Sequence, residues 1–314
     1  MSTTVTAHPQ LTRVQAVTAR LAGRFSFTRL HLQVAVGALW LLDGALQAQP
    51  FMFTRGFATQ IIAPTGQGQP GVVAGPVHLG STIIAAHPVV WNVLFAAAQI
   101  LLGVGLILAR GRAARVALAA SIGWALGVWY LGEGLSGLAS GHASLVSGAP
   151  GSALLYAIFA AAAWPRRGTS GQVPASWLLP VWALLWIVAA GYQLLPGQDT
   201  GTALAGLLSS GGGDPHWLAS LDAPVASWMS GNGALAVSGL AALELLVGLG
   251  ALSRRTRTWS LAIGLVVILA IWVLGQDLGQ LYSGRATDPN SAPLIALMAI
   301  VLIGARSSTP RTPT

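Results

Sequence analysis

The chain has no cysteine, no lysine and few charged residues of any kind. Without cysteine it can form no disulfide, no thiolate metal site and no CxxC redox centre. Only 8% of its 314 residues are charged, whereas 54% are hydrophobic. Soluble domains carry about a quarter charged residues, so a water-soluble fold of this size could not cover its surface. These deficits favour an integral membrane protein.

Because lysine is absent, the net charge of +8 comes from arginine alone. A basic chain can indicate nucleic-acid binding. Here, however, the arginines occur in short clusters between apolar runs. That pattern is typical of membrane topology. We therefore expect the lipid bilayer, and no nucleic acid, as the partner of this chain.

About 20 apolar residues are needed to span a bilayer as a helix. The run that starts at residue 32 could be a signal peptide, but Asp43 interrupts it and a similar run recurs at 177–196. We expect it to be retained. Eight runs are candidate spans, of which the fourth and eighth are short: 32–49, 90–109, 116–138, 149–164, 177–196, 233–252, 258–280 and 291–305.

The arginines also predict the orientation of these spans. With a cytoplasmic N-terminus, every arginine except Arg55 and Arg285 falls on the inner side of the membrane. Such a bias is the positive-inside signal. The sequence thus predicts a multi-pass protein of the cell membrane with both termini cytoplasmic.

An internal repeat divides the chain. With a shift of 143 residues, 129–150 aligns with 272–293 without a gap, and ten of the 22 pairs are identical. Four spans per copy, an even number, give both copies one orientation, related by an axis along the membrane normal. We expect an all-α integral membrane protein with eight transmembrane helices in two co-oriented four-helix repeats. The segments are a cytoplasmic N-terminal segment (1–31), the first repeat (32–168), the second repeat (169–306) and a cytoplasmic tail (307–314).

Small residues also recur at helical spacing. Gly123 and Gly127 form a GxxxG pair, as do Gly275 and Gly279. Such pairs let two helices approach closely in lipid. We expect both pairs to lie at helix–helix contacts.

Acidic and amide side chains inside the spans are the main functional signal. A carboxylate at the bilayer centre costs roughly 2.5–3.5 kcal/mol on insertion scales. Such a group therefore indicates either a ligand-binding or proton-handling site, opening outward, or interhelical hydrogen bonds that hold the bundle together. The repeat aligns Gln99 with Glu244 and Glu133 with Gln276, so the two exchanges run in opposite directions. The candidates are Asp43, Gln47, Gln99, Glu133, Gln193, Glu244, Gln276 and Asp277.

Catalytic residues are not identifiable in this sequence, and whether the chain is an enzyme stays open. Four histidines fall on the expected outer side, where with Met52 they could bind copper. Their spacing is typical of no known metal site, so we expect no metal. The four are His78, His87, His142 and His216.

The helix that runs from Glu244 through Gly248 and Gly250 to Arg254 resembles the DoxX-like family of small four-helix membrane proteins. The end of the first helix, from Gly44 to Pro50, is similar to a family motif, with Gln47 where a lysine is usual. The resemblance implies a four-helix fold for each repeat and a link to redox metabolism. One branch, DoxD, is a subunit of a thiosulfate:quinone oxidoreductase.

Three functions follow from these observations. The first is a redox-associated subunit that binds a quinone-like or small apolar ligand near the outer face, with Gln47, Glu133 and Gln276 bonded to the ligand's oxygens. The second is a non-catalytic scaffold that docks a partner protein through the long outer loops 50–89 and 197–232. The third is a proton-coupled carrier of a small solute, in which Glu244 handles the proton.

Overall fold

The computed structural model describes residues 27–165, 171, 173–208 and 215–305. Within these ranges the chain forms helices and no β-strand. The tail 307–314, Arg166 and Arg167, and all but the last five residues of segment 1–31 lie outside the described residues. The α-helices are α2 (Arg29–Gln47), α3 (Gly71–Ala86), α4 (Pro88–Leu108), α5 (Gly111–Leu131), α6 (Ser152–Ala163), α7 (Ala175–Gln193), α8 (Gly201–Leu208), α9 (His216–Gly231), α10 (Gly233–Leu252), α11 (Arg257–Leu274) and α12 (Ser291–Ala305).

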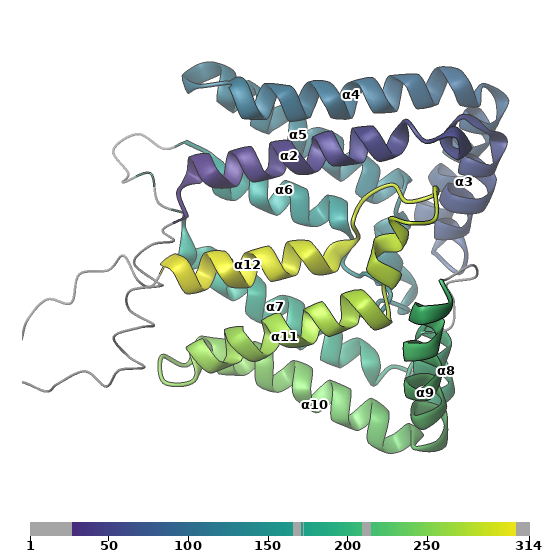
Figure 1. Cartoon of the computed structure of the whole chain (residues 1–314), viewed down its shortest axis with the longest axis vertical. Coiled ribbons are helices and arrows are strands. Elements are labelled where there is room, and N and C mark those ends of the chain that lie inside the picture. The colour runs from purple at the N-terminus through teal and green to yellow at the C-terminus, as the bar shows by residue number, and fades with distance from the viewer. Residues whose placement is uncertain (1–26, 166–170, 172, 209–214, 306–314) are drawn as a thin grey trace, which may run out of the picture.

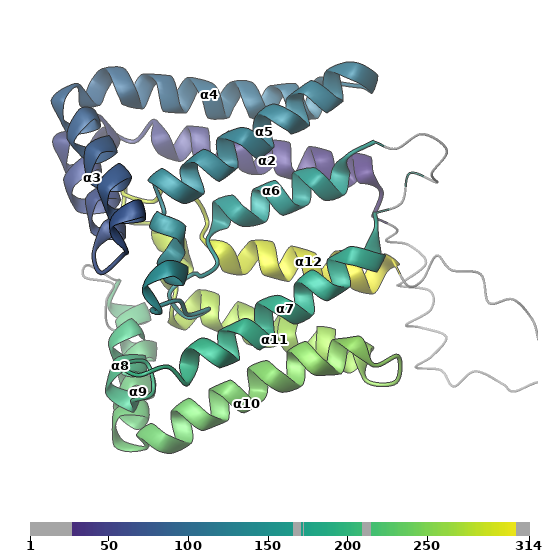
Figure 2. The same ribbon diagram turned by 180° about the vertical axis from the view of Figure 1, so that it is seen from behind.

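Most of these helices run side by side, while α3, α8 and α9 lie across one end of the bundle (Figures 1 and 2). Three shorter helical segments, η1 (Pro50–Phe53), η2 (Phe57–Ile62) and η3 (Ala63–Gly66), precede α3. Among the described residues, five helices are long and apolar enough to cross a membrane, namely α4, α5, α7, α10 and α11. The fold is therefore all-helical and fits a multi-pass membrane protein.

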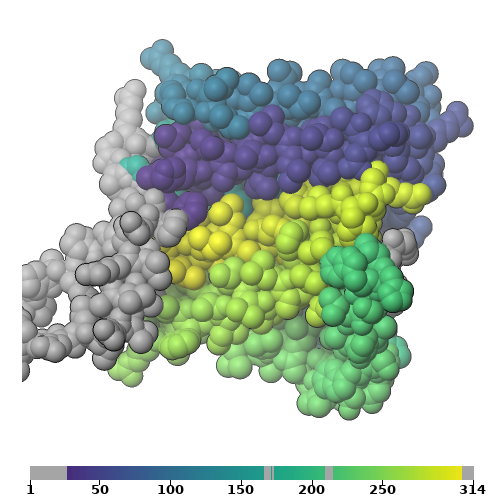
Figure 3. All heavy atoms as spheres, in the orientation of Figure 1, coloured from purple at the N-terminus to yellow at the C-terminus, as the bar shows by residue number. Residues whose placement is uncertain are grey.

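The order of the elements is the same in the two halves of the chain. In the first half α2, α3, α4, α5 and α6 follow one another, and in the second half α7, α9, α10, α11 and α12. On the face drawn in Figure 3, α2 (purple), α12 (yellow) and α11 (yellow-green) pack as neighbouring stripes. The second half has one additional short helix, α8, before α9.

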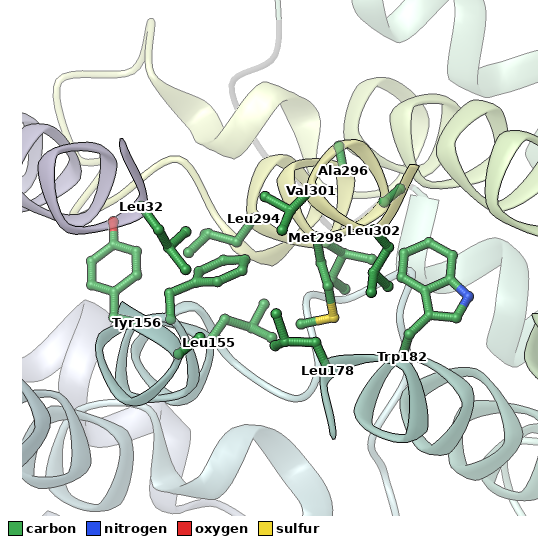
Figure 4. Packing of buried hydrophobic residues seen from close by; sticks show 14 of the residues in the cluster. Leu32, Leu155, Tyr156, Leu178, Trp182, Leu294, Ala296, Met298, Val301 and Leu302 are labelled. Carbon is green, nitrogen blue, oxygen red and sulfur yellow. The ribbon is translucent and has the colours of Figure 1, made fainter. Parts of the chain in front are cut away.

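The two short spans expected from the sequence are the central helices. α6 and α12 lie in the middle of the bundle, with α4 and α10 at opposite edges (Figures 1 and 2). Leu155 and Tyr156 of α6 face Leu294 and Met298 of α12 across a buried apolar core (Figure 4). Most residues of α6 and α12 are buried inside the protein. Because α6 and α12 are enclosed in this way, their length need not match the bilayer.

Arginines close several helix ends opposite α3 and α9. The last carbonyls of a helix have no partner within it. Arg29 donates to the Trp164 oxygen at 2.5 Å, just beyond α6. Arg257 Nε donates to the Ala251 oxygen at 2.8 Å near the end of α10. Positive charge at a helix C-terminus is favourable, so these arginines stabilise the bundle as well as marking one end of it, called here the arginine end.

After α5 and α11 the chain makes a left-handed turn. The residues of η4 (Gly134–Ser140) from Gly134 to Gly137 all have positive φ, from 52° to 79°. Those of η5 (Asp277–Gln280) likewise have φ from 48° to 66°. Positive φ is unusual outside glycine. The expected spans 116–138 and 258–280 are therefore too long, because the right-handed helices end at Leu131 and Leu274.

The loops that follow these turns cross into the opposite half. Gln276 Nε2 of the second half donates to the Leu145 oxygen of the first-half loop at 2.8 Å. In the other direction, Arg285 of the second-half loop lies over the Phe51 ring at 4.5 Å. The two halves thus interlock through residues 141–151 and 281–290.

Only one of the two GxxxG pairs packs closely. A Cβ added at Gly275 would press on Val146, and one at Gly279 would press on Pro289, so this pair lies against loop segments. Gly123 and Gly127 have nothing within 4 Å of an added Cβ. The expectation of helix–helix contacts is therefore wrong for both pairs. Gly123 and Gly127 leave open space instead of filling it.

Candidate functional site

A cavity of about 330 Å³ lies in the first half, between α2, α3, α4, α5 and α6. Four of the eight candidate residues, Asp43, Gln47, Gln99 and Glu133, line it together. They come from α2, α4 and the turn after α5, so helix packing gathers residues that are up to 90 positions apart in the sequence. The other polar residues of the lining are Ser152, Tyr156, Thr287 and Asp288.

Aromatic rings form much of the remaining wall. Trp40, Phe95 and Trp124 line the cavity from three different helices. The Phe95 and Trp124 rings meet with centroids 6.1 Å apart. Gly123 and Gly127 are exposed on α5 and also line the cavity. The cavity is therefore open to the side of the bundle beside α5, through a gap that the two glycines keep clear.

Asp43 is the most enclosed carboxyl of the cavity. Its side chain is 2% exposed, and its Oδ1 accepts a hydrogen bond of 3.0 Å from the Tyr156 hydroxyl. The Tyr156 and Trp40 rings form a T-shaped contact with centroids 4.6 Å apart, and Trp40 Nε1 donates to Ser121 Oγ at 2.8 Å. This series of contacts joins α2, α5 and α6 and holds Asp43 in place.

Glu133 closes the N-terminal end of α6. Its Oε1 accepts from Ser152 Oγ at 2.8 Å and from the Ala153 amide at 3.0 Å. A carboxylate is favourable at a helix N-terminus, where backbone N–H groups lack partners. Gly151, with φ of 101°, lies so close to Glu133 Oε2 that any side chain there would collide with the carboxyl. Glu133 is thus both a structural cap and part of the cavity wall.

Asp288 is a cavity residue that the sequence reasoning missed. It lies in the loop before α12, whose position in the first half follows from the interlocking of the halves. Its Oδ1 accepts from the Asn290 amide at 2.8 Å, and its Oδ2 accepts from Thr287 at 2.8 Å. It lies in a predicted outer loop, outside the expected spans. Its neighbours in the sequence gave no signal that it would reach a site in the other half.

Gln47 and Gln99 differ in how their amides are used. Gln47 Nε2 donates to Asn92 Oδ1 at 2.6 Å, and Asn92 Nδ2 donates to the Gln47 backbone oxygen at 2.8 Å. Gln99 is 8% exposed, and its Oε1 has no hydrogen-bond partner in the described part of the chain. A buried amide oxygen without a partner is costly. Gln47 therefore joins α2 to α4, while Gln99 offers a free acceptor to the cavity.

The ionisable groups of the cavity are mainly acidic. Asp43, Glu133 and Asp288 interact with one another electrostatically, and no arginine or histidine of the described chain lines the cavity. Glu133 lies beyond the last residue of α5. Burial, together with the nearby Asp288 charge, raises the pKa of the Glu133 carboxyl to about 7. A site of this kind favours hydrogen-bond donors or positive charge in whatever it binds.

The other four candidates lie in the second half and do not line the cavity. Gln276 Oε1 accepts from the Ala292 amide at 3.0 Å, so this residue caps α12 as Glu133 caps α6. Glu244 is fully buried beside Gln193, whose Nε2 donates to Ser144 Oγ at 3.1 Å. Asp277 is buried at the start of the left-handed turn. The structure thus does not place Gln276 with Gln47 and Glu133 around one ligand.

The hydrogen bonds of two tryptophans show which residues of the two halves correspond to each other. Trp129 Nε1 donates to the Pro150 oxygen at 2.8 Å, and Trp272 Nε1 donates to the Pro289 oxygen at 2.9 Å. Pro150 therefore corresponds to Pro289, four residues before the Pro293 of the ungapped alignment. In this register Asp43 and Tyr156 of the first half correspond to Ala189 and Ile295 of the second, and Asp288 of the second-half loop corresponds to Ala149 of the first-half loop. None of the three counterparts is polar.

Within the described ranges there is no group of three histidine, cysteine, aspartate or glutamate side chains that could hold a metal ion. Comparisons with protein-family models, with curated proteins and with solved structures gave no match to this chain. The function of the site is therefore inferred from its own geometry.

Proposed function

We propose that the chain is a polytopic cell-membrane protein with eight spans in two co-oriented four-helix repeats, both termini being cytoplasmic. The matching order of elements in the two halves and the paired Trp129 and Trp272 bonds support the duplication. The enclosed position of α6 and α12 accounts for their shortness. The arginine distribution supports the orientation, so that α3, α8 and α9 lie at the outer face.

In this arrangement the protein holds a small, largely apolar ligand in the cavity of the first half, near the outer face. The observation that carries this proposal is the convergence of Asp43, Gln99 and Glu133 on one cavity with aromatic walls. Ligand sites are typically concave and mostly apolar, with a few convergent polar groups. The volume of about 330 Å³ is within the range of small-molecule sites.

The polar groups of the cavity favour a ligand that donates hydrogen bonds. Carboxylates and the free Gln99 oxygen are acceptors, and the Tyr156 hydroxyl is already directed at Asp43. Among redox-active molecules, a quinol with its two hydroxyl donors fits this set better than a quinone. With a quinol as the ligand, the protein would be a redox-associated subunit, as the DoxX-like resemblance implies.

The two other hypotheses have less support in the geometry. A carrier that couples to protons through Glu244 would need that residue on the solute path, yet Glu244 is fully buried and does not line the cavity. A scaffold would use α3 and α9, where Val72 and Trp217 are exposed. Exposed apolar side chains on such crosswise helices are equally expected where helices lie in the headgroup region.

The test is purification from native membrane, followed by extraction and mass analysis of bound small molecules. Gly127→Phe should fill the cavity mouth and remove the ligand, since a side chain there meets only open space. Ala270→Phe is the matched control, because Ala270 is the exposed repeat counterpart of Gly127 on α11. The proposal predicts a molecule in wild type and in the control that is lost from Gly127→Phe. Equal contents in all three proteins would contradict it.

A further inference from the structure

We propose that the ligand of this cavity is a lipophilic organic cation, an amine or quaternary ammonium compound whose charged group lies among Asp43, Glu133 and Asp288. The inference rests on the proposed function, because it names the chemical class that the same cavity takes. It replaces the quinol as the preferred ligand.

The first argument is the arrangement of charge. Three carboxyls reach the cavity from three separate segments: α2, the turn after α5, and the loop before α12. The cavity lining in the described chain contains no arginine and no histidine. Arg285, the arginine nearest to Asp288 in the sequence, lies over the Phe51 ring at 4.5 Å and donates to Gln60 at 3.4 Å. No side chain of the lining balances the charge of an ionised carboxyl here, whereas a cationic ligand would.

The second argument is independent of the carboxyls. Gln99 is 8% exposed and lines the cavity from α4, and its Oε1 lacks a partner among the described residues. A buried acceptor of this kind is satisfied by a donor on a bound molecule. Among the buried atoms of the lining, Trp124 Nε1 is a donor that also lacks a partner in the described chain. The N–H or polarised C–H groups around an ammonium centre suit a wall dominated by acceptors.

The third argument distinguishes an organic cation from a metal ion. No three ionisable side chains of the described chain are placed to ligate one metal ion. The cavity of about 330 Å³ is also far larger than a metal site requires. Trp40, Phe95 and Trp124 line the same space, and the faces of aromatic rings attract ammonium groups by cation–π interaction.

The mouth of the cavity fits the apolar part of such a molecule. Gly123 and Gly127 leave the side of α5 open, and the nearby Leu126 and Leu131 are 42% and 44% exposed. In a bilayer this mouth would face hydrocarbon. A cation with an apolar body could therefore enter sideways from the lipid and place its charged end at the carboxyls.

The experiment compares two probes of one shape. Phenyltrimethylammonium and tert-butylbenzene differ in a single central atom, which carries the positive charge only in the first. Each is titrated calorimetrically into the full-length protein in a nonionic detergent. We expect the cation to bind about tenfold or more tightly than its neutral counterpart, and Asp43→Asn and Asp288→Asn each to weaken it about tenfold. Glu244→Gln, which changes a buried carboxyl outside the cavity, should leave both affinities unchanged.

Retained tert-butylbenzene binding shows that each variant is folded. Equal affinity for the two probes, or unchanged cation affinity in both aspartate variants, would overturn the cation inference. In that case loss of binding in Gly127→Phe would still support the cavity as a ligand site. If neither probe bound, the cation inference would again fail. The extraction experiment on Gly127→Phe would then decide the proposed function separately.

Discussion

At the scale of single residues, Glu133 combines two roles that are usually separate. Its carboxyl accepts from Ser152 and from the Ala153 amide at the start of α6, and it also faces the cavity beside Asp288. Capping favours the ionised form, whereas burial and the neighbouring carboxyl oppose it. The balance raises the pKa of Glu133 to about 7, so this group exchanges a proton close to neutral pH.

The raised pKa of Glu133 has a consequence for stability. Between its ordinary pKa of 4.5 and about 7 the folded protein holds a proton on Glu133 that the unfolded chain has released. Stability from this proton is complete below the lower value and is lost as the pH rises through about 7. We expect the melting temperature in detergent to fall across this window. Glu133→Gln should flatten the dependence of the melting temperature on pH. Glu244→Gln should keep the part of that dependence that Glu133 contributes. An identical slope in wild type and Glu133→Gln would contradict the assignment.

The sequence identified part of this constellation. An acid inside an apolar run is costly, which is why Asp43 and Glu133 could be singled out. Gln99 followed from its alignment with Glu244. Asp288 could not be found in this way, because nothing in local periodicity shows that a loop of the second half completes a cavity of the first. A buried amide is costly unless it is hydrogen-bonded. Gln276 was therefore a candidate for ligand binding, but its amide is bonded to the start of α12 instead.

At the scale of elements, the left-handed turns decide where α6 and α12 begin. Hydropathy marked the long helices to within a few residues, because apolar length is what a membrane span requires. It could not show that 132–138 and 275–280 leave the helix, because an average over the length of a span hides a few polar residues at its end. The turn redirects the chain so that Glu133 reaches the first amides of α6.

The turn can be tested at Gly134. Its φ is 53°, and a Cβ there would collide with the Thr65 oxygen. Gly134→Ala should lower the free energy of unfolding by about 1–3 kcal/mol or more through backbone strain and the collision. Gly75, inside α3 and with nothing near an added Cβ, is the control. There alanine should be neutral or stabilising by up to about 1 kcal/mol. Thermal unfolding of both variants in detergent provides the comparison, and a tolerated Gly134→Ala would argue against the turn.

At the scale of the whole molecule, the two halves have similar frames but different interiors. The Trp129 and Trp272 bonds and the two helix caps occur in both halves. The cavity of the first half is lined by Asp43 and, from the second-half loop, by Asp288, whereas their repeat counterparts are Ala189 and, in the first-half loop, Ala149. A shared frame of this kind is what the sequence repeat predicts; the repeat itself stays a prediction. The difference in chemistry was visible as single substitutions, but only the structure shows that they fall around one cavity.

The arrangement in the membrane can be measured directly, because a chain without cysteine needs no background substitutions. Thr59, Ala113 and Ser253 are all exposed. In intact cells, a membrane-impermeant maleimide should label Thr59→Cys. Ala113→Cys and Ser253→Cys should react only after permeabilisation, since both lie at the arginine end. Labelling that put residues 113 and 253 on opposite sides of the membrane would rule out co-oriented repeats.

Because the two halves exchange loops, a smaller protein with only one four-helix unit of this design would have to form a dimer. Residues 281–290 bring Asp288 into a cavity whose other walls come from the first half, and 141–151 are bonded to Gln276 in the second. One four-helix unit on its own would leave its pocket open on one side. A protein with a single unit of this design would therefore need a second identical subunit to close it. In this chain each half already supplies a loop to the other, so the acidic cavity is closed without a second subunit.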